Sequence, residues 1–118
     1  MEKRDICERT FAFAVAVIAF CRSIERGRLT ERLLAKQLFR SGTSIGANVE
    51  EAQAGQSRAD FISKMSIARK EARETKYWFR LAKALGMGTA EVAESLLQEA
   101  DEFIAIITVI IKRTKALS

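Results

Sequence analysis

The 118-residue sequence predicts an all-α protein that folds as an antiparallel up-down-up-down four-helix bundle. Three observations support this prediction. Apolar residues recur at helical spacing in four long segments, proline is absent, and only short loops separate the segments. Short loops between long helices make neighbouring helices antiparallel. No internal repeat, linker or low-complexity stretch interrupts the pattern, so a single domain is expected over residues 1–118.

The first helix is expected from about Asp5 to Arg26, where Gly27 ends it. Its apolar residues form two adjacent stripes, namely Cys7, Phe11, Ala14, Ile18 and Cys21, and Ile6, Phe13, Val17, Phe20 and Ile24. The apolar run at 11–21 is about half as long as a bilayer crossing requires, and no signal peptide opens the chain. We therefore expect a cytoplasmic protein with no membrane partner. Since the first and fourth helices are apolar on nearly all sides, we also expect a homo-oligomer.

The second helix is expected to start at Thr30, a good N-cap residue, and to end near Ala54, before Gly55. It contains the stretch RSGTSIGANVEEA (40–52), whose glycines and hydroxyls are also typical of a phosphate-binding loop. A P-loop, however, needs G-x-x-x-x-G-K-[ST], and this stretch has neither the spacing nor the lysine. A helix is therefore favoured through the stretch.

Gly42 and Gly46 lie four residues apart, so they share one face of this helix. Glycine within a helix costs about 0.5–1 kcal/mol relative to alanine. Close packing against a bulky partner would offset that loss, and the glycine pair is therefore predicted to be a helix contact. The third helix, with its aromatic run at 77–79, is the expected partner.

Ser57 is expected to cap the third helix, which continues to Leu85. Thr89 is expected to cap the fourth, which continues to about Lys115. The run FIAIITVII at 103–111 is rich in β-branched residues and would also suit a buried strand. A helix is favoured because the chain offers no second strand to satisfy the backbone of the first.

Polar residues on the facing sides of the second and third helices predict a partly buried ionic and hydroxyl network. Its expected members are Arg40, Ser44, Glu51, Glu71 and Glu74. Arg40 would face a carboxylate of the third helix. The alternative is a set of solvated surface charges.

The stretches FRSGTSIGANVEEA (39–52) and DFISKMSIARKEARETKYWF (60–79) resemble the four-helix-bundle family named for 23S rRNA intervening sequences. The chain is also similar to the accessory variability protein of diversity-generating retroelements, a basic pentamer that binds nucleic acid and a reverse transcriptase. The resemblance implies a ring-like homopentamer and no enzymatic activity. Phe79 departs from the family pattern, where leucine is the usual neighbour of the tryptophan, and this departure is expected to alter packing rather than fold.

The charge balance favours anionic partners. Lysine and arginine number 20 against 15 acidic residues, for a net charge of +5. Histidine is absent, which removes the commonest general base and metal ligand and excludes Ser-His and Cys-His nucleophile chemistry within the chain. No catalytic residue, cofactor or metal is predicted. Glu71 and Glu74 could act as metal ligands, but ferritin-like sites also need Glu-x-x-His.

A basic stripe on the third helix is the strongest functional signal. Residues 57–85 hold eight basic and three acidic residues, so this segment alone carries +5. Five of the cations share one helix face: Arg69, Arg73, Lys76, Arg80 and Lys83. They predict binding of RNA or DNA phosphates. An equally weighted alternative is a solvated face that Glu94, Glu99 or Asp101 partly neutralises.

Two further questions stay open at this point. Tyr77, Trp78 and Phe79 could form a base-stacking platform, although core packing is favoured because adjacent residues on a helix point in different directions. The partner of the basic stripe could also be an acidic protein surface, which would make the chain a structural or protein-interaction oligomer. Steep log-linear weakening by salt would distinguish nucleic acid from such a partner.

Overall fold

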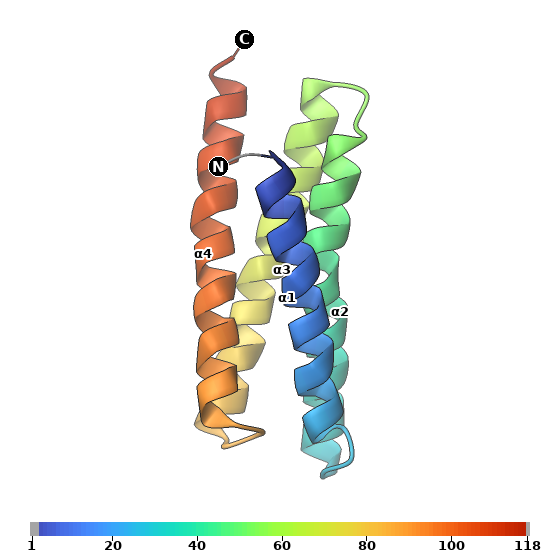
Figure 1. The fold of residues 1–118 in the computed structure, drawn as a ribbon, viewed down its shortest axis with the longest axis vertical. Helices are drawn as coiled ribbons and strands as arrows, with labels where there is room; N and C mark the ends of the chain where they lie inside the picture. Colours follow the sequence, from blue (N-terminus) through green and yellow to red (C-terminus); the bar gives the residue numbers. More distant parts are fainter. Residues whose placement is uncertain (1–2, 118) are drawn as a thin grey trace.

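The computed structural model describes residues 3–117, which form four long α-helices (Figure 1). The helices are α1 (Lys3–Ile24), α2 (Leu29–Gln53), α3 (Arg58–Ala84) and α4 (Ala90–Lys115). No strand occurs within the described residues, so the segment at 103–111 is helical and the all-α prediction is confirmed. The molecule is elongated, with extents of 50 × 20 × 19 Å.

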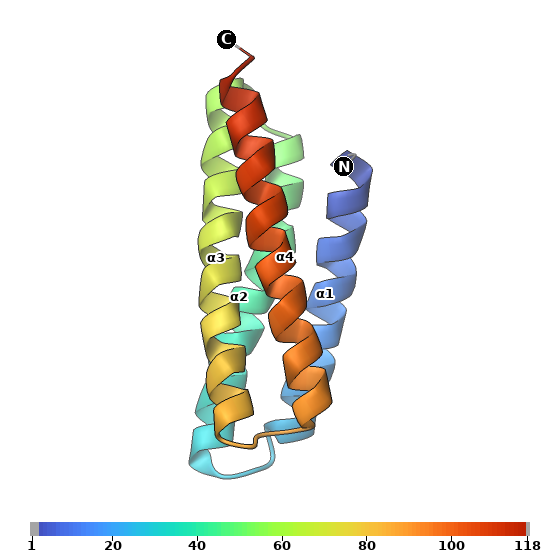
Figure 2. The ribbon, with the colours of Figure 1, turned by 90° about the vertical axis from the view of Figure 1, so that its left-hand side faces the viewer.

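The helices form the predicted up-down-up-down bundle. Each helix packs against the next one in the chain, and α1 also contacts α4, which closes the bundle. Figure 1 shows the two termini towards one end of the molecule, and Figure 2 shows the α1–α2 and α3–α4 loops at the opposite end. The long side of α3 therefore runs beside α2 on one flank and α4 on the other.

The helix ends lie within about two residues of the predicted positions. Ser57 caps α3 by accepting a hydrogen bond from the backbone amide of Asp60 at 3.1 Å, and Thr89 occupies the N-cap position of α4. The predicted cap at Thr30 is wrong. Arg28 is the N-cap of α2, because the extended backbone ends there and the Thr30 hydroxyl donates to the Glu31 carboxylate instead.

A glycine turn ends α3 and positions α4 beside it. Gly86 has a φ of +67°, a conformation that favours glycine. The Met87 amide donates to the Ala82 carbonyl at 2.9 Å, and the Gly86 amide donates to the Lys83 carbonyl at 3.2 Å. This pair of bonds is a Schellman motif, and it satisfies two carbonyls at the end of α3.

The core contains one of the two apolar stripes predicted for α1. Ile6, Phe13, Val17, Phe20 and Ile24 are all buried. The Phe13 ring meets that of Phe103 edge-on at 5.2 Å, and the Phe20 ring meets that of Phe79 at 5.3 Å. Phe79 is therefore accommodated in the core by an aromatic partner on α1.

The other α1 stripe is only partly covered. Cys21 is buried at one end, and its thiol donates to the Ala35 carbonyl of α2. Burial raises the pKa of the Cys21 thiol to about 11. Phe11, in contrast, is 63% exposed. This part of α1 therefore presents apolar surface to solvent.

The glycine pair forms a close helix contact, but its partner differs from the prediction. A Cβ atom on Gly42 would lie 2.7 Å from Val17 Cγ1, and one on Gly46 would lie 3.2 Å from the backbone carbonyl of Thr10. Both contacts are with α1, so the expectation that α3 packs against the glycines is wrong. Gly42 and Gly46 are on the side of α2 that turns towards α1, whereas Ser41 turns towards α3.

None of the helices in the described part of the chain is both long and apolar enough to cross a membrane.

Candidate nucleic-acid interface

The predicted basic stripe divides into two groups, because α4 packs along one side of α3. Three of its cations face α4. Arg69 donates to the Thr108 hydroxyl at 3.3 Å, Lys76 pairs with Asp101 at 2.8 Å, and Lys83 pairs with Glu94. We call these three residues and their partners the α3/α4 seam. Within the seam, the two lysines are paired with carboxylates and Arg69 is turned towards α4.

The other two cations of the stripe, Arg73 and Arg80, are exposed and form no ion pair within residues 3–117. Lys70 is likewise exposed and has no ion pair among the described residues. The spacing 70, 73, 77, 80 places these three cations and Tyr77 on one side of the helix. We call these four residues the outer α3 face.

Lys70 is a site residue that sequence reasoning missed. It lies next to Arg69, and one residue along a helix corresponds to a rotation of about 100°. That rotation turns Arg69 towards α4 and Lys70 towards solvent. The sequence places Lys70 in the same cluster of charges as the stripe. The position of α4 around α3, however, determines which of these cations is exposed.

The three adjacent aromatic residues have different environments. Phe79 is fully buried, Trp78 is half-buried and hydrogen-bonded to Glu74 at 3.3 Å, and Tyr77 is 50% exposed. The Tyr77 and Trp78 rings meet edge-on at 5.3 Å. Core packing therefore accounts for Phe79 and for much of Trp78, while Tyr77 alone belongs to the exposed surface.

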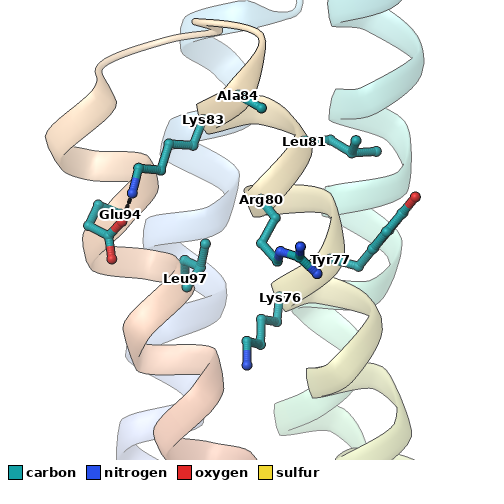
Figure 3. A pocket seen from close by; sticks show the side chains of 8 residues that line it. All are labelled: Lys76, Tyr77, Arg80, Leu81, Lys83, Ala84, Glu94 and Leu97. Carbon is teal, nitrogen blue, oxygen red and sulfur yellow. Dashed lines mark hydrogen bonds and ion pairs between the residues drawn. The ribbon is translucent and has the colours of Figure 1, made fainter.

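A shallow groove of about 750 Å³ runs between α3 and α4, and Tyr77 and Arg80 of the outer α3 face line it together with the seam residues Lys76, Lys83 and Glu94 (Figure 3). Figure 3 shows Lys83 reaching across the groove to Glu94, while Tyr77 points away from α4. The Arg80 guanidinium lies between the side chains of Lys76 and Tyr77. The hydrogen bond from Lys83 lowers the pKa of the Glu94 carboxyl, as expected for a carboxylate held by a cation.

Two of the acids considered as neutralisers do act on the stripe, and the third does not. Asp101 and Glu94 pair with its lysines. Glu99 pairs with Arg9 of α1, which also contacts Glu102 at 3.1 Å and lies over the Phe103 ring. These pairs raise the pKa of the Arg9 guanidinium, chiefly through the hydrogen bond to Glu99. Glu99 therefore joins α4 to α1.

The polar network between α2 and α3 centres on Arg40. Its guanidinium contacts Glu71 at 3.4 Å and also pairs with Glu74. Burial raises the pKa of the Glu71 carboxyl, although Arg40 acts in the opposite direction. This pair of contacts holds both carboxylates on the α2 side of α3.

The remaining predicted members of the network lie outside it. The Ser44 hydroxyl donates to the Arg40 carbonyl within its own helix. Glu51 is exposed and forms no ion pair with a described residue. A buried hydroxyl pair that was not predicted, Ser41 and Thr75 at 2.9 Å, joins the two helices instead. Because Thr75 also bonds the Glu71 carbonyl, both groups are satisfied without water.

The carboxylates that form ion pairs are distributed over several separate places in the bundle. Within the described residues, no three His, Cys, Asp or Glu side chains gather where they could hold a metal ion.

Comparisons with known proteins identify relatives of this bundle. The family model described as 23S rRNA-intervening sequence protein matches residues 2–109. A solved structure of a protein with unknown function, from the S23 ribosomal protein family of Bacteroides thetaiotaomicron, superposes with a TM-score of 0.85. It shares 37% sequence identity, over 95% of this chain and 99% of the other. No match is found among curated proteins.

Proposed function

The chain belongs to the family of 23S rRNA-intervening sequence proteins, and from this premise we propose that it is a non-enzymatic homo-oligomer that binds nucleic acid through the outer α3 face. The observation that carries the proposal is the set of three exposed, unpaired cations Lys70, Arg73 and Arg80 on one side of α3. Cations of this kind are free to replace the counterions of a phosphate backbone.

The position of the neighbouring acids supports this proposal. Glu71 and Glu74, the two carboxylates nearest to these cations along the helix, are bound by Arg40 on the α2 side. On the other flank, Asp101 and Glu94 are bound by Lys76 and Lys83. Phosphates that approach the outer α3 face would therefore meet cations without an ion pair, while Arg40, Lys76 and Lys83 hold the nearest carboxylates on the two flanks of the helix.

Self-association is supported by the exposed side of α1. Between Arg9 and Arg22 this helix has no charged residue, and its exposed positions are Phe11, Ala12, Val15 and Ala19. Phe11 is 63% exposed and Val15 is 55% exposed. A contiguous apolar surface of this kind is typical of an interface between chains. The family resemblance favours a ring of five subunits, in which each subunit would contribute one outer α3 face.

The alternative partner is an acidic protein surface, which the same cations would also attract. Geometry favours nucleic acid, because an aromatic ring lies among the cations and nucleic-acid sites commonly combine the two. A binding role rather than catalysis is consistent with a chain that lacks histidine.

The test is a salt titration of binding to RNA, to DNA and to polyglutamate, with the full-length protein. We expect the logarithm of the nucleic-acid affinity to fall linearly with the logarithm of salt concentration, with little dependence on base sequence. Arg73→Gln with Arg80→Gln should weaken binding and flatten the slope.

The matched control is Arg32→Gln with Lys36→Gln, which removes the same charge from an exposed part of α2. This control should retain most of the affinity. Equal losses in the two double variants would assign binding to net charge alone. Preference for polyglutamate over both nucleic acids would overturn the proposal in favour of the acidic partner.

A further inference from the structure

We infer that the outer α3 face takes single-stranded rather than double-stranded nucleic acid, with an unpaired base stacked on the ring of Tyr77. This inference rests on the proposed function and specifies its ligand. It starts from the different exposure of three adjacent aromatic residues. Tyr77 is 50% exposed, whereas Trp78 is half-buried and Phe79 is fully buried.

The exposure of Tyr77 is not required by the fold. Phe79 fills the core and Trp78 packs at the α2 side, where its indole donates to Glu74. Within the described residues the Tyr77 ring has one ring contact, a T-shaped one with Trp78, and its hydroxyl forms no hydrogen bond. A half-exposed aromatic ring that is supported on one side offers a face to a planar ligand.

Cations flank this ring along the helix axis. Arg73 is four residues before Tyr77 and Arg80 is three residues after it, so the two guanidinium groups are attached about 10 Å apart on the same side of α3. A base on the tyrosine would therefore have a cation available for the phosphate on either side.

This arrangement discriminates between the two forms of nucleic acid. In a duplex both faces of each internal base are covered by its neighbours, so an aromatic side chain on a helix surface cannot stack on it. In a single strand the bases can unstack and lie on aromatic side chains, independently of sequence. Lys70, Arg73 and Arg80 would bind either form, but Tyr77 adds affinity for the single strand alone.

The experiment compares an oligothymidylate of about 15 nucleotides with a blunt duplex of the same length, over the same series of salt concentrations. We expect Tyr77→Leu, which keeps apolar bulk and loses the aromatic face, to weaken single-strand binding about fivefold or more. Tyr77→Phe should bind like the wild type. Duplex affinity should be the same in all three proteins.

Trp78 provides a second readout, because it is the only tryptophan in the chain and its ring contacts Tyr77. Its fluorescence should change on addition of the single strand and change less with the duplex. Circular dichroism and thermal unfolding establish that each variant is folded.

The inference is overturned if Tyr77→Leu binds the single strand as tightly as the wild type does, or if the duplex is preferred. That result leaves the proposed function intact as long as Arg73 and Arg80 still govern the salt dependence. Absence of salt-dependent binding to either form would overturn the proposed function as well.

Discussion

Arg69 and Lys70 are adjacent on α3, but only Lys70 presents its charge fully to solvent. Arg69 lies against α4 and donates to Thr108, while its Nε atom is buried without a partner among the described residues. Lys76 and Lys83 hold carboxylates of α4. At the scale of single residues, the direction of each side chain around the helix axis decides whether a cation joins helices or remains available to a ligand.

Glu71 leads to a prediction about pH. Its side chain is only 13% exposed, and burial raises the pKa of its carboxyl above the ordinary value. A raised folded-state pKa stabilises the protein below the unfolded pKa of about 4.3, and this contribution is lost as pH rises through the folded pKa. We therefore expect Glu71→Gln to gain stability relative to the wild type as pH rises from about 4 to neutral.

Urea unfolding of both proteins at acidic and neutral pH measures this difference. Glu51→Gln, at an exposed position of α2, serves as the control and should track the wild type. If Glu71→Gln instead loses stability relative to the wild type as pH rises, the bond to Arg40 outweighs the cost of burying the charged carboxylate.

At the scale of elements, α2 is asymmetric. Its α1 side carries small residues, so that Val17 approaches Gly42 and the Thr10 backbone approaches Gly46. Its α3 side carries the Ser41–Thr75 hydroxyl pair and the Arg40 bridge. The same helix therefore makes a close apolar contact on one flank and a polar contact on the other.

The Gly42 contact predicts a dependence on Val17. In the wild-type background, overpacking against Val17 should cost Gly42→Ala about 1–3 kcal/mol of stability. The higher helix propensity of alanine should offset about 1 kcal/mol of that cost. With Val17→Ala already present, the space is free and Gly42→Ala should be neutral or stabilising. Thermal unfolding of the four proteins completes the double-mutant cycle. Equal destabilisation in both backgrounds would contradict the contact.

The ends of most helices were predictable from the sequence. Gly27, Gly55 and Gly86 follow the helices, and Ser57 caps α3, because local backbone chemistry ends and starts helices. The partner of Gly42 was not predictable in the same way. Helical periodicity shows that two residues share a face, but it does not show which neighbouring helix lies over that face.

The candidate site was only partly predictable, because the sequence does not show which helix lies over each face of α3. Clustering of charge identified α3 as the basic helix, and Arg73 and Arg80 are exposed as the phosphate-binding prediction requires. The division between outer face and seam depends on where α4 lies, and α4 contributes Asp101, Glu94 and Thr108 from positions far along the chain. Lys70 and the exposure of Tyr77 become evident only when α4 is in place.

At the scale of the whole molecule, exposed apolar surface on α1 and exposed charge on α3 occupy different helices. Phe11 and Val15 are therefore available for contacts between chains without covering Arg73 and Arg80. In a ring, repeated outer α3 faces would bind one strand together, and weak contacts would combine through multivalency.

Light scattering tests the assembly. The wild type should give a mass several times the 13.2 kDa of one chain, and five chains is the expected number. Phe11→Glu with Val15→Glu should reduce the assembly to monomers, because the apolar α1 surface then carries charge. Leu33→Glu, at an equally exposed apolar position of α2, should leave it intact. A wild-type monomer that is stable at micromolar concentration would refute the prediction.

We expect the phosphates to bind to the outer α3 face and not to the α3/α4 seam. Two double variants test it with the same change of charge on the same helix: Arg73→Gln with Arg80→Gln, and Lys76→Gln with Lys83→Gln. The measurement is the slope of log affinity against log salt for one single-stranded oligonucleotide. We expect the outer-face variant to lose affinity and about 0.7 of slope per phosphate contact removed, while the seam variant keeps a slope near that of the wild type. Equal slopes in the two variants, or a larger loss in the seam variant, would contradict it.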